Sequence, residues 1–341
     1  MADARAVVRW GIVGCGDVTE VKSGPALSKA DGSALVAVMR RDRARAEDYA
    51  RRHGVGKAFD NADRLIADED VDAVYVATPP STHLDLARRV AAAGKPCLVE
   101  KPMARSHAEC EQMVEAFRAR GLPLWVAYYR RALPRFVQIR DLLRGGAIGR
   151  PTAVDVRITD RLAAGTTLAN WRFDAAVAGG GLFLDLGSHC VDLLDFFFGP
   201  IDDVRGLAVN TGGAYAAEDV TAMVYRFGSG VLGTGTWNFN AHEKSDVIAI
   251  TGTDGAIVTP VFSDADVRVI GRHGTDTLGI RNPPHVHQPL IQTIVDELRG
   301  RGRCESTGES GARASWVMDR CLEGYRTVHG SMNSTRVPSG S

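Results

Sequence analysis

The sequence predicts an α/β protein in which a doubly wound parallel sheet precedes a second domain with a large, mainly antiparallel open sheet. Three observations support this fold class. The first third of the chain alternates short apolar runs with amphipathic stretches, as strand–helix–strand units do. A Gly-x-Gly turn follows the first apolar run. Residues 151–270 then hold a series of β-rich runs separated by turns.

Composition excludes several classes of function. The chain carries 41 basic and 41 acidic side chains, so no net charge attracts it to nucleic acid or to an anionic membrane. Its six cysteines are scattered without a Cys-x-x-Cys pair, which predicts neither a disulfide framework nor a zinc site and fits a reducing compartment. The N-terminus lacks the apolar stretch of a secretion signal, and no apolar run approaches a membrane span, so we expect a cytoplasmic protein.

The elements of the first part follow one another in a regular order. Apolar or β-branched runs predict strands, and the amphipathic stretches between them predict helices. The expected strands are residues 8–14, 34–41, 72–80, 96–102 and 123–129, and the expected helices are residues 17–30, 43–54, 81–95 and 106–120. Such units predict a parallel sheet with helices on both faces.

The alternation of strand and helix segments ends near residue 129. The β-rich runs of residues 151–270 are interrupted by one strong helical segment, at residues 181–198. This pattern predicts a mainly antiparallel sheet. Two amphipathic segments, near residues 288–299 and 311–328, are expected to close the fold.

The turn after the first strand carries Gly14 and Gly16. A strand that ends there and continues as a helix leaves the first helical N–H groups pointing outward, which suits a phosphate. An isolated Gly-x-Gly also fits an ordinary tight turn, and Thr19 stands where the fingerprint has glycine or alanine. The position at the start of a strand–helix–strand series favours dinucleotide binding, in which Asp17 and Val18 would take part.

The end of the second strand bears on which dinucleotide binds. An acidic residue there would hold the ribose 2′-hydroxyl of NAD, whereas an arginine would bind the 2′-phosphate of NADP. The sequence reads Arg40, Arg41 and then Asp42, so it favours NADP(H) and leaves NAD(H) possible. In the alternative interpretation, both arginines are solvated and Asp42 holds the ribose.

The third strand ends in Ala-Thr-Pro-Pro-Ser-Thr-His, at the carboxyl edge where open α/β sheets bind ligands. Thr78, Pro79 and His83 are therefore expected beside the cofactor. The alternative is a proline turn that caps a helix, with His83 on the surface.

The next strand ends in Val-Glu-Lys-Pro-Met-Ala and should present Glu100 and Lys101 at the same edge. A lysine beside a nicotinamide can donate a proton or a hydrogen bond to a substrate oxygen. The alternative for Lys101 is an exposed turn residue.

The segment from residue 170 to residue 199 combines glycines, acids and a histidine. Gly179, Gly180 and Gly181 break the chain before a helix on which Asp185 and His189 lie four residues apart. That spacing puts the carboxylate and the imidazole on one helical face, where the acid can orient the ring for proton transfer. Asp192 and Asp195 would cap, pair or face solvent. The alternative is an amphipathic helix whose polar stripe merely contains these residues.

The order of Gly-Ile-Val-Gly-Cys-Gly-Asp-Val, Ala-Thr-Pro-Pro-Ser-Thr-His, Glu-Lys-Pro-Met-Ala and Gly-Gly-Gly-Leu-Phe-Leu-Asp-Leu-Gly-Ser-His resembles the Gfo/Idh/MocA oxidoreductase family. That family includes glucose-fructose oxidoreductase and inositol dehydrogenase. The resemblance extends over residues 6–328. It implies a dinucleotide-binding Rossmann domain at residues 1–128 and an α+β domain for substrate binding and oligomerisation at residues 129–330, with a loose tail at residues 331–341. The open sheet would then form a homodimer or a homotetramer.

The resemblance also implies roles for individual residues. Lys101, Asp185 and His189 match the catalytic group of the family. The residues expected to contact substrate are Tyr128, Arg131, Trp171, Arg172 and His189. The residues expected to bind the cofactor are Gly14, Gly16, Asp17, Val18, Arg40, Arg41, Thr78, Pro79, His83, Glu100 and Lys101. Thr19 and Arg40 depart from the pattern of many relatives.

The resulting hypothesis is an NAD(P)-dependent oxidoreductase that acts on a sugar, a polyol or a related carbonyl or hydroxyl compound. His189 would exchange the proton with substrate, Asp185 would orient it, and Lys101 would stabilise the oxyanion. Two alternatives stay open: a glycosidase or sugar–sugar oxidoreductase that recycles tightly bound NAD, and a regulator that senses the cofactor without catalysis. The alternating His285 and His287 have no neighbouring Cys or acidic ligand, so we expect no metal site.

Overall fold

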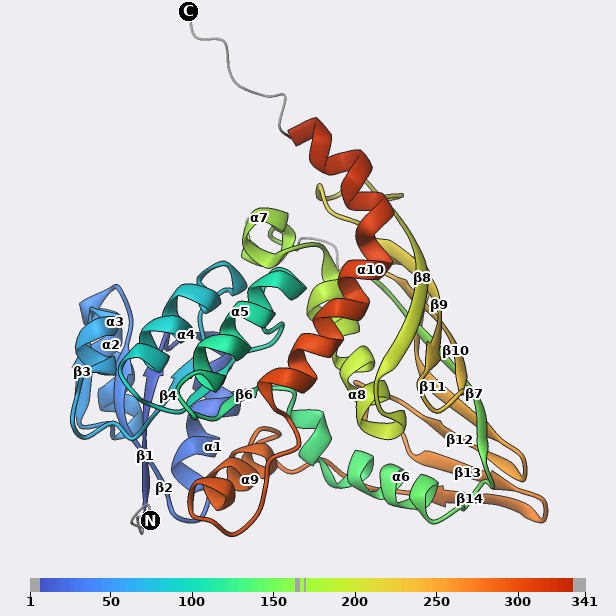
Figure 1. The fold of residues 1–341 in the computed structure, drawn as a ribbon, viewed down its shortest axis with the longest axis horizontal. Coiled ribbons are helices and arrows are strands. Elements are labelled where there is room, and N and C mark those ends of the chain that lie inside the picture. Colours follow the sequence, from blue (N-terminus) through green and yellow to red (C-terminus); the bar gives the residue numbers. More distant parts are fainter. Residues whose placement is uncertain (1–6, 163–165, 169, 334–341) are drawn as a thin grey trace, which may run out of the picture. The chain divides into compact units, whose positions relative to one another are not determined.

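The computed structural model describes residues 7–162, 166–168 and 170–333 (Figure 1). Within these residues the chain divides into two compact units. Unit 1 takes its residues from Met1–Gln138 and Arg281–Ser315, and unit 2 from Ile139–Ile280 and Trp316–Ser341. The division differs from the single continuous second domain expected over residues 129–330, because a segment near the C-terminus returns to unit 1.

Six parallel strands form the sheet of unit 1, in the order β3-β2-β1-β4-β5-β6. This order confirms the predicted doubly wound sheet. The strands are β1 (Val8–Val13), β2 (Ser33–Met39), β3 (Lys57–Phe59), β4 (Ala73–Val76), β5 (Cys97–Val99) and β6 (Leu124–Val126). Strand β3 is missing from the sequence prediction, because three residues are too few to show a period.

Helices cover both faces of this sheet. Successive side chains of β1 point to opposite faces, so each face has residues of β1 that pack against a helix. Trp10 and Ile12 share one core with Leu27 of the first α-helix. On the other face, a Cβ at Gly11 would lie 2.7 Å from Leu65 Cδ2, so a helix approaches the backbone closely there. The helical segments are η1 (Thr19–Ser23), α1 (Gly24–Lys29), α2 (Arg43–His53), α3 (Ala62–Ile66), η2 (Pro80–Thr82), α4 (His83–Ala92), α5 (His107–Arg118) and η3 (Tyr129–Ala132).

Helix α9 (Gln288–Leu298) explains why the late segment belongs to unit 1. Its residues Leu290, Ile291, Ile294 and Val295 form one apolar stripe, and all four are buried in the core that contains Trp10 and Ile12. Removing this stripe from water stabilises the helix on the first sheet rather than elsewhere.

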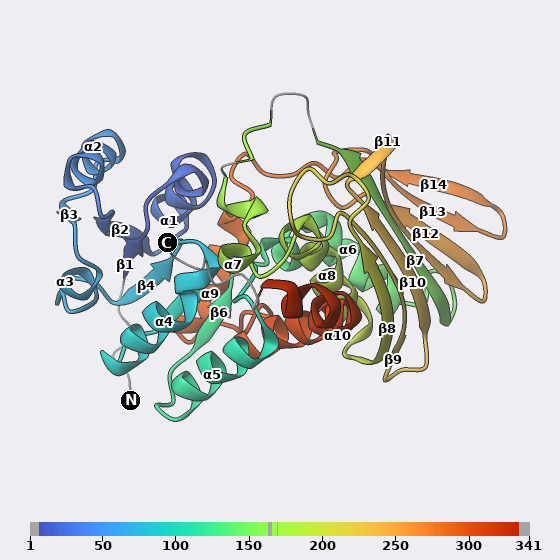
Figure 2. The same ribbon diagram turned by 90° about the horizontal axis from the view of Figure 1, so that it is seen from above.

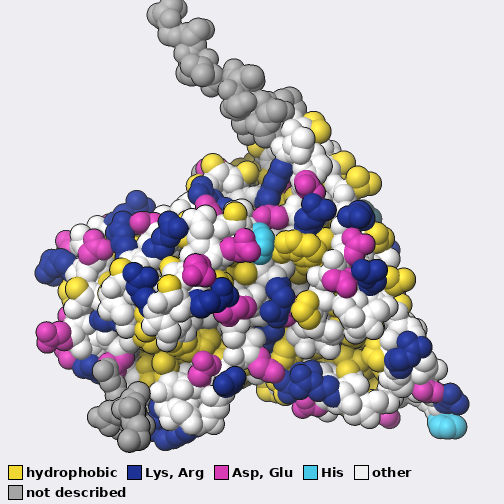
Figure 3. Space-filling view, viewed as in Figure 1, with side chains coloured by type: hydrophobic (Ala, Val, Ile, Leu, Met, Phe, Trp, Pro, Cys, Tyr) yellow, Lys and Arg dark blue, Asp and Glu magenta, His cyan; other side chains and the backbone are white. Residues whose placement is uncertain are grey.

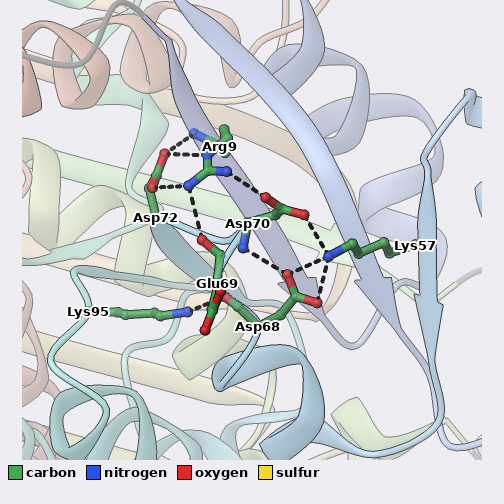
Figure 4. Close-up of polar contacts among 7 residues, drawn as sticks. All are labelled: Arg9, Lys57, Asp68, Glu69, Asp70, Asp72 and Lys95. Carbon is green, nitrogen blue, oxygen red and sulfur yellow. Dashed lines mark hydrogen bonds and ion pairs between the residues drawn. The ribbon is translucent and has the colours of Figure 1, made fainter.

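Charged residues join the amino-terminal ends of the strands in unit 1 (Figure 4). Arg9 at the start of β1 binds both carboxylate oxygens of Asp72, at 3.0 and 3.1 Å, and also pairs with Asp70. Lys57 at the start of β3 pairs with Asp68 and Asp70, at 2.8 and 2.7 Å. The acidic groups at this edge are thus held in ion pairs, while the predicted site residues lie at the carboxyl edge.

Eight strands form the sheet of unit 2, in the order β14-β13-β12-β11-β7-β10-β9-β8. Every neighbouring pair is antiparallel except β7 and β10, so the prediction of a large, mainly antiparallel sheet is confirmed. The strands are β7 (Pro151–Arg161), β8 (Ile201–Val209), β9 (Val220–Phe227), β10 (Leu232–Asn238), β11 (Asn240–Gly252), β12 (Gly255–Thr259), β13 (Val267–Gly271) and β14 (Gly274–Leu278).

Helices cover one face of this sheet (Figure 2). Aromatic rings make the contact, with Phe183 and Trp237 centroids 5.0 Å apart and Phe198 and Phe227 centroids also 5.0 Å apart. The helical segments are α6 (Pro134–Arg144), η4 (Trp171–Phe173), α7 (Ala175–Ala178), η5 (Phe183–Gly187), α8 (Ser188–Phe198) and α10 (Gly308–Asn333). Helix α10 continues to Asn333, so the first three residues of the expected tail are helical, and residues 334–341 lie outside the described residues.

One stretch of unit 2 corrects the expectation that no segment reaches the length of a membrane span. Residues Ala175–Phe198 are long and apolar enough to cross a membrane by length and composition, but 78% of their most apolar window is buried inside the structure. Such burial is typical of a core helix of a folded domain. On the face shown in Figure 3, acidic and basic side chains are interspersed, as the balanced composition predicts.

Candidate active site

The glycine turn after β1 lies directly against the end of β4. Gly14 has φ +95°, a conformation that favours glycine, and a Cβ there would lie 2.6 Å from Thr78 Cγ2. The N–H groups of Gly14 and Cys15 both donate to the carbonyl oxygen of Met39, at 2.9 and 3.1 Å. The turn is therefore fixed between the ends of β2 and β4.

Gly16 has a different environment. A Cβ there would meet only the carbonyl oxygen of Gly14, at 3.9 Å, so packing within the protein does not require glycine at this position. The open space leaves the backbone accessible to an outside group, which is what a pyrophosphate needs. The exposed Asp17 and the half-buried Val18 follow directly.

Thr19 replaces the third glycine of the fingerprint and has a structural role. Its buried hydroxyl donates to the carbonyl oxygen of Gly16 at 2.7 Å, and its own carbonyl accepts a hydrogen bond of 2.8 Å from the Tyr49 hydroxyl. A Cβ at Gly24 would collide with these same groups. Close packing therefore depends on Gly24, which the sequence analysis does not single out.

The basic residues after β2 are separated by the structure. Arg40 is half-buried, and its Nη1 donates to the carbonyl oxygen of Cys15 at 3.3 Å, which places the guanidinium beside the glycine turn. Arg41 is exposed. Asp42 caps α2, because its Oδ1 accepts the N–H of Arg45 at 3.1 Å.

His83 is buried, so the alternative of a surface histidine is wrong. Its Nε2 lies 2.7 Å from the carbonyl oxygen of Thr78, and its Nδ1 lies 3.1 Å from that of Met103. Burial lowers the pKa of His83. The ring thus supports the Thr78 and Pro79 loop from inside, and its contact with a cofactor stays a prediction.

Glu100 is buried, although the sequence placed it at the open edge with Lys101. Its Oε2 accepts the N–H of Lys101 at 3.0 Å, and its Oε1 accepts the hydroxyl of Tyr75. Burial alone would raise the pKa of Glu100, but His287, the charge of Lys101 and the Tyr75 hydroxyl outweigh it and lower the pKa. Glu100 is therefore a carboxylate that supports Lys101, which itself is half-buried.

The two histidines considered as metal ligands face different groups. His285 Nε2 lies 2.7 Å from Lys29 Nζ, whereas His287 Nε2 lies 3.5 Å from Glu100 Oε1. Within the described residues, no group of three or more His, Cys, Asp and Glu side chains could hold a metal ion.

Tyr128 and Arg131 follow β6 and are both buried in unit 1. The backbone N–H of Arg131 donates to the carbonyl oxygen of Tyr128, and its guanidinium donates to that of Glu305, each at 3.2 Å. Their contact with substrate stays a prediction.

In unit 2 the structure brings three predicted residues together. The guanidinium of Arg172 lies 4.6 Å from the ring centroid of Trp171, and its Nε lies 3.4 Å from Asp185 Oδ2. The indole and the carboxylate thus hold the cation on η4 and η5.

The segment that carries Asp185 and His189 is not one regular α-helix. Asp185 lies on the π-helical turn η5, and His189 lies on α8, buried, with its ring 6.2 Å from that of Phe262. A π-helical turn bonds residues five apart, so the helix type changes between the two residues, and their placement on one face stays a prediction. Asp192 and Asp195 are buried, which excludes the solvent-facing alternative for them.

Glu218, just before β9, is a site residue that the sequence analysis missed. Its Oε1 accepts the N–H of Gly181 at 2.8 Å, and a Cβ at Gly181 would lie only 3.1 Å from the same oxygen. Burial raises the pKa of Glu218 to about 6. The triple glycine indicates that another group approaches the backbone closely, but only the fold shows that this group is the carboxyl group of Glu218.

Comparison with family models and with curated proteins identifies the family of the chain. Residues 8–128 match the model of an oxidoreductase family with an NAD-binding Rossmann fold, and residues 136–258 match the GFO/IDH/MocA C-terminal domain. Oxidoreductase P35 of Formosa agariphila is 37% identical over 92% of this chain and 97% of its own. The 1,5-anhydro-D-fructose reductase of Ensifer adhaerens is 28% identical over 89% of this chain and 92% of its own.

Among solved structures, a levoglucosan dehydrogenase in complex with NADH and levoglucosan superposes with a TM-score of 0.84 at 22% identity. The match covers 94% of this chain and 97% of the dehydrogenase. At this level of identity the likeness shows a shared fold.

The raised pKa of Glu218 predicts how stability depends on pH. The folded state binds this proton more tightly than the unfolded state, so the contribution of Glu218 to wild-type stability falls as pH rises from about 4.5 to about 6. Glu218→Gln keeps an oxygen for Gly181 but loses the titration. Its free energy of unfolding relative to wild type should rise by about 2 kcal/mol between pH 4 and pH 7 in urea titrations.

The exposed Glu323 on α10 provides the control, and Glu323→Gln should leave the pH dependence of stability unchanged. A constant difference between Glu218→Gln and wild type across this pH range would contradict the assignment.

Proposed function

The chain belongs to the Gfo/Idh/MocA oxidoreductase family and is an NAD(P)-dependent oxidoreductase, and we propose that it uses NADP(H) to interconvert carbonyl and hydroxyl groups of sugar-like compounds. Relatives named for 1,5-anhydro-D-fructose and levoglucosan support this substrate class. We take 1,5-anhydro-D-fructose as the first compound to test.

The residues at the carboxyl edge of unit 1 fit a dinucleotide. The open space at Gly16 suits a pyrophosphate, and this is the observation that carries the proposal. The nicotinamide supplies hydride transfer when bound. Lys101, held through its N–H by Glu100, would donate a hydrogen bond to the substrate oxygen.

The residues of unit 2 would handle the proton. His189 would protonate the developing alkoxide during reduction and remove the same proton during oxidation. Asp185 and Arg172 form an ion pair beside Trp171, which would hold the carboxylate in place near substrate. Because a regulator needs no proton donor, the presence of Lys101, Asp185 and His189 together favours an enzyme.

Two contacts support the preference for NADP(H). The Arg40 guanidinium lies beside the glycine turn, where it could bind a 2′-phosphate in a charge-assisted contact. Asp42 is committed to capping α2, which weighs against the alternative that it holds the ribose of NAD.

Arg40→Ala should weaken NADPH binding by about tenfold to a hundredfold, because it removes a hydrogen-bonded charge from the 2′-phosphate. NADH binding should change less than about twofold, since NADH lacks that phosphate. Fluorescence titration with both nucleotides measures this, with Arg41→Ala as the exposed neighbour for comparison. An equal loss of affinity for NADPH and NADH would contradict the proposed 2′-phosphate contact.

His189→Ala should lower turnover of 1,5-anhydro-D-fructose with NADPH by about 100-fold to 10,000-fold, the usual contribution of a general acid. The dissociation constant of NADPH should stay within about twofold. His273→Ala, at an exposed histidine of the same unit, is the control. Unchanged turnover in His189→Ala would remove this residue from the catalytic role.

We also propose a homodimer or homotetramer formed through the outer face of the large sheet. Leu207, Val224 and Leu232 lie on three adjacent strands and are 80, 55 and 60% exposed. Exposed apolar side chains grouped in this way favour contact with another protein surface. The free, buried state of all six cysteines supports a cytoplasmic location.

The double change Leu207→Glu and Val224→Glu should convert the oligomer to a smaller species, because it would bury carboxylates in the contact. Sedimentation velocity gives the mass. Val21→Glu, at a comparably exposed valine of unit 1, should keep the wild-type mass. A monomeric wild-type protein, or a double variant of unchanged mass, would contradict this interface.

A further inference from the structure

We propose that His287 is a positioning residue, which holds the Glu100 carboxylate and, through it, the backbone of Lys101. The inference rests on the proposed function, because that function makes Lys101 the catalytic lysine. It gives a role to a histidine that the sequence analysis considered only as a metal ligand.

The carboxylate of Glu100 needs compensation, because a buried charge without partners is costly. Glu100 is only 7% exposed. The Tyr75 hydroxyl donates to one carboxylate oxygen, and the Lys101 N–H donates to the other at 3.0 Å. Both donors are neutral groups. A further polar partner would stabilise the carboxylate, and His287 Nε2 lies 3.5 Å from Glu100 Oε1.

His287 itself has few other polar neighbours. The residue is 2% exposed, and its ring lies against that of Tyr129, with centroids 4.4 Å apart. Among the described residues, neither ring nitrogen makes a regular hydrogen bond. The contact of Nε2 with Glu100 Oε1 is therefore the polar interaction that this buried ring makes among the described residues.

The position of His287 in the chain makes it a link between separate elements. It precedes α9, and its carbonyl oxygen accepts the N–H of Ile291 at 3.0 Å, so the helix fixes its backbone. Its side chain meets Glu100 after β5 and Tyr129 after β6. Loss of the imidazole would free the carboxylate to shift, and the Lys101 N–H would move with it.

His285 offers a matched control in the same loop. Its ring lies near Lys29 Nζ at 2.7 Å and near the carbonyl oxygen of Val21 at 3.3 Å, and the residue is half-buried. A change at His285 alters the loop but leaves the Glu100 carboxylate untouched.

The experiment compares His287→Phe, His287→Gln, the double variant His287→Phe with Glu100→Gln, and His285→Gln. Phenylalanine keeps a ring against Tyr129 but removes the ring nitrogens, and glutamine keeps a donor. The double variant removes the carboxylate charge that needs a partner. Thermal melting first establishes which variants fold, and His287→Gln serves if His287→Phe does not.

Two readouts are measured on the full chain. The first is kcat and KM for reduction of 1,5-anhydro-D-fructose with NADPH. The second is the rate at which trinitrobenzenesulfonate modifies Lys101 without nucleotide, followed by peptide mass spectrometry. His287→Phe should lower kcat at least tenfold with KM changed less than threefold, and should change the modification rate at least threefold. His287→Gln and the double variant should recover part of both effects, and His285→Gln should match wild type.

Wild-type modification rate and kcat in a folded His287→Phe would overturn the positioning role, as would equal effects in His285→Gln. If the wild-type protein reduces no 1,5-anhydro-D-fructose, the proposed substrate fails. The modification rates of Lys101 then still decide the role of His287, because they need neither nucleotide nor substrate.

Discussion

The parallel pairing of β1 with β2 and β4 is the constraint on which the rest of unit 1 depends. It brings the carboxyl ends of these strands to one edge, so that the glycine turn, Arg40 and Thr78 become neighbours despite their separation in the chain. The glycine turn can sit there only because Gly14 adopts a positive φ and approaches Thr78 closely. At the opposite edge, ion pairs around Arg9 and Lys57 hold the acidic residues (Figure 4).

Each unit also contains a buried glutamate next to residues of the candidate site, and the pKa values of the two glutamates shift in opposite directions. Glu100 faces His287, the Tyr75 hydroxyl and the charge of Lys101, which together outweigh burial and lower its pKa. Glu218 has the N–H of Gly181 as its main partner, so burial dominates and raises its pKa. The first glutamate is therefore ionised beneath Lys101, and the second carries a proton in mildly acidic solution next to the glycines that precede Asp185.

The motifs indicated most of the candidate site, because each lies where one strand ends or one helix begins. The open position of Gly16 and the Arg40 guanidinium near the turn agree with expectations from local sequence. Trp171 and Arg172 were expected only from the family resemblance, and their grouping with Asp185 comes from the structure. The sequence analysis did not foresee that His83 and Glu100 are buried and bond to neighbouring groups of the protein. It missed Glu218, because the local sequence around Glu218 does not indicate that its carboxyl group bonds to Gly181, which lies far away in the chain.

Local sequence was enough to predict the fold class, the parallel sheet with helices on both faces, and the positions of the glycine turn and the lysine. These features depend on short-range periodicity and on residues with special backbone conformations. Three features became known only from the tertiary structure. Helix α9 packs on the first sheet, the helix around Asp185 begins as a π-helical turn, and His287 Nε2 lies near Glu100 Oε1. These features depend on contacts of apolar surfaces and buried charges with residues far away in the chain, and such contacts cannot be predicted from local sequence.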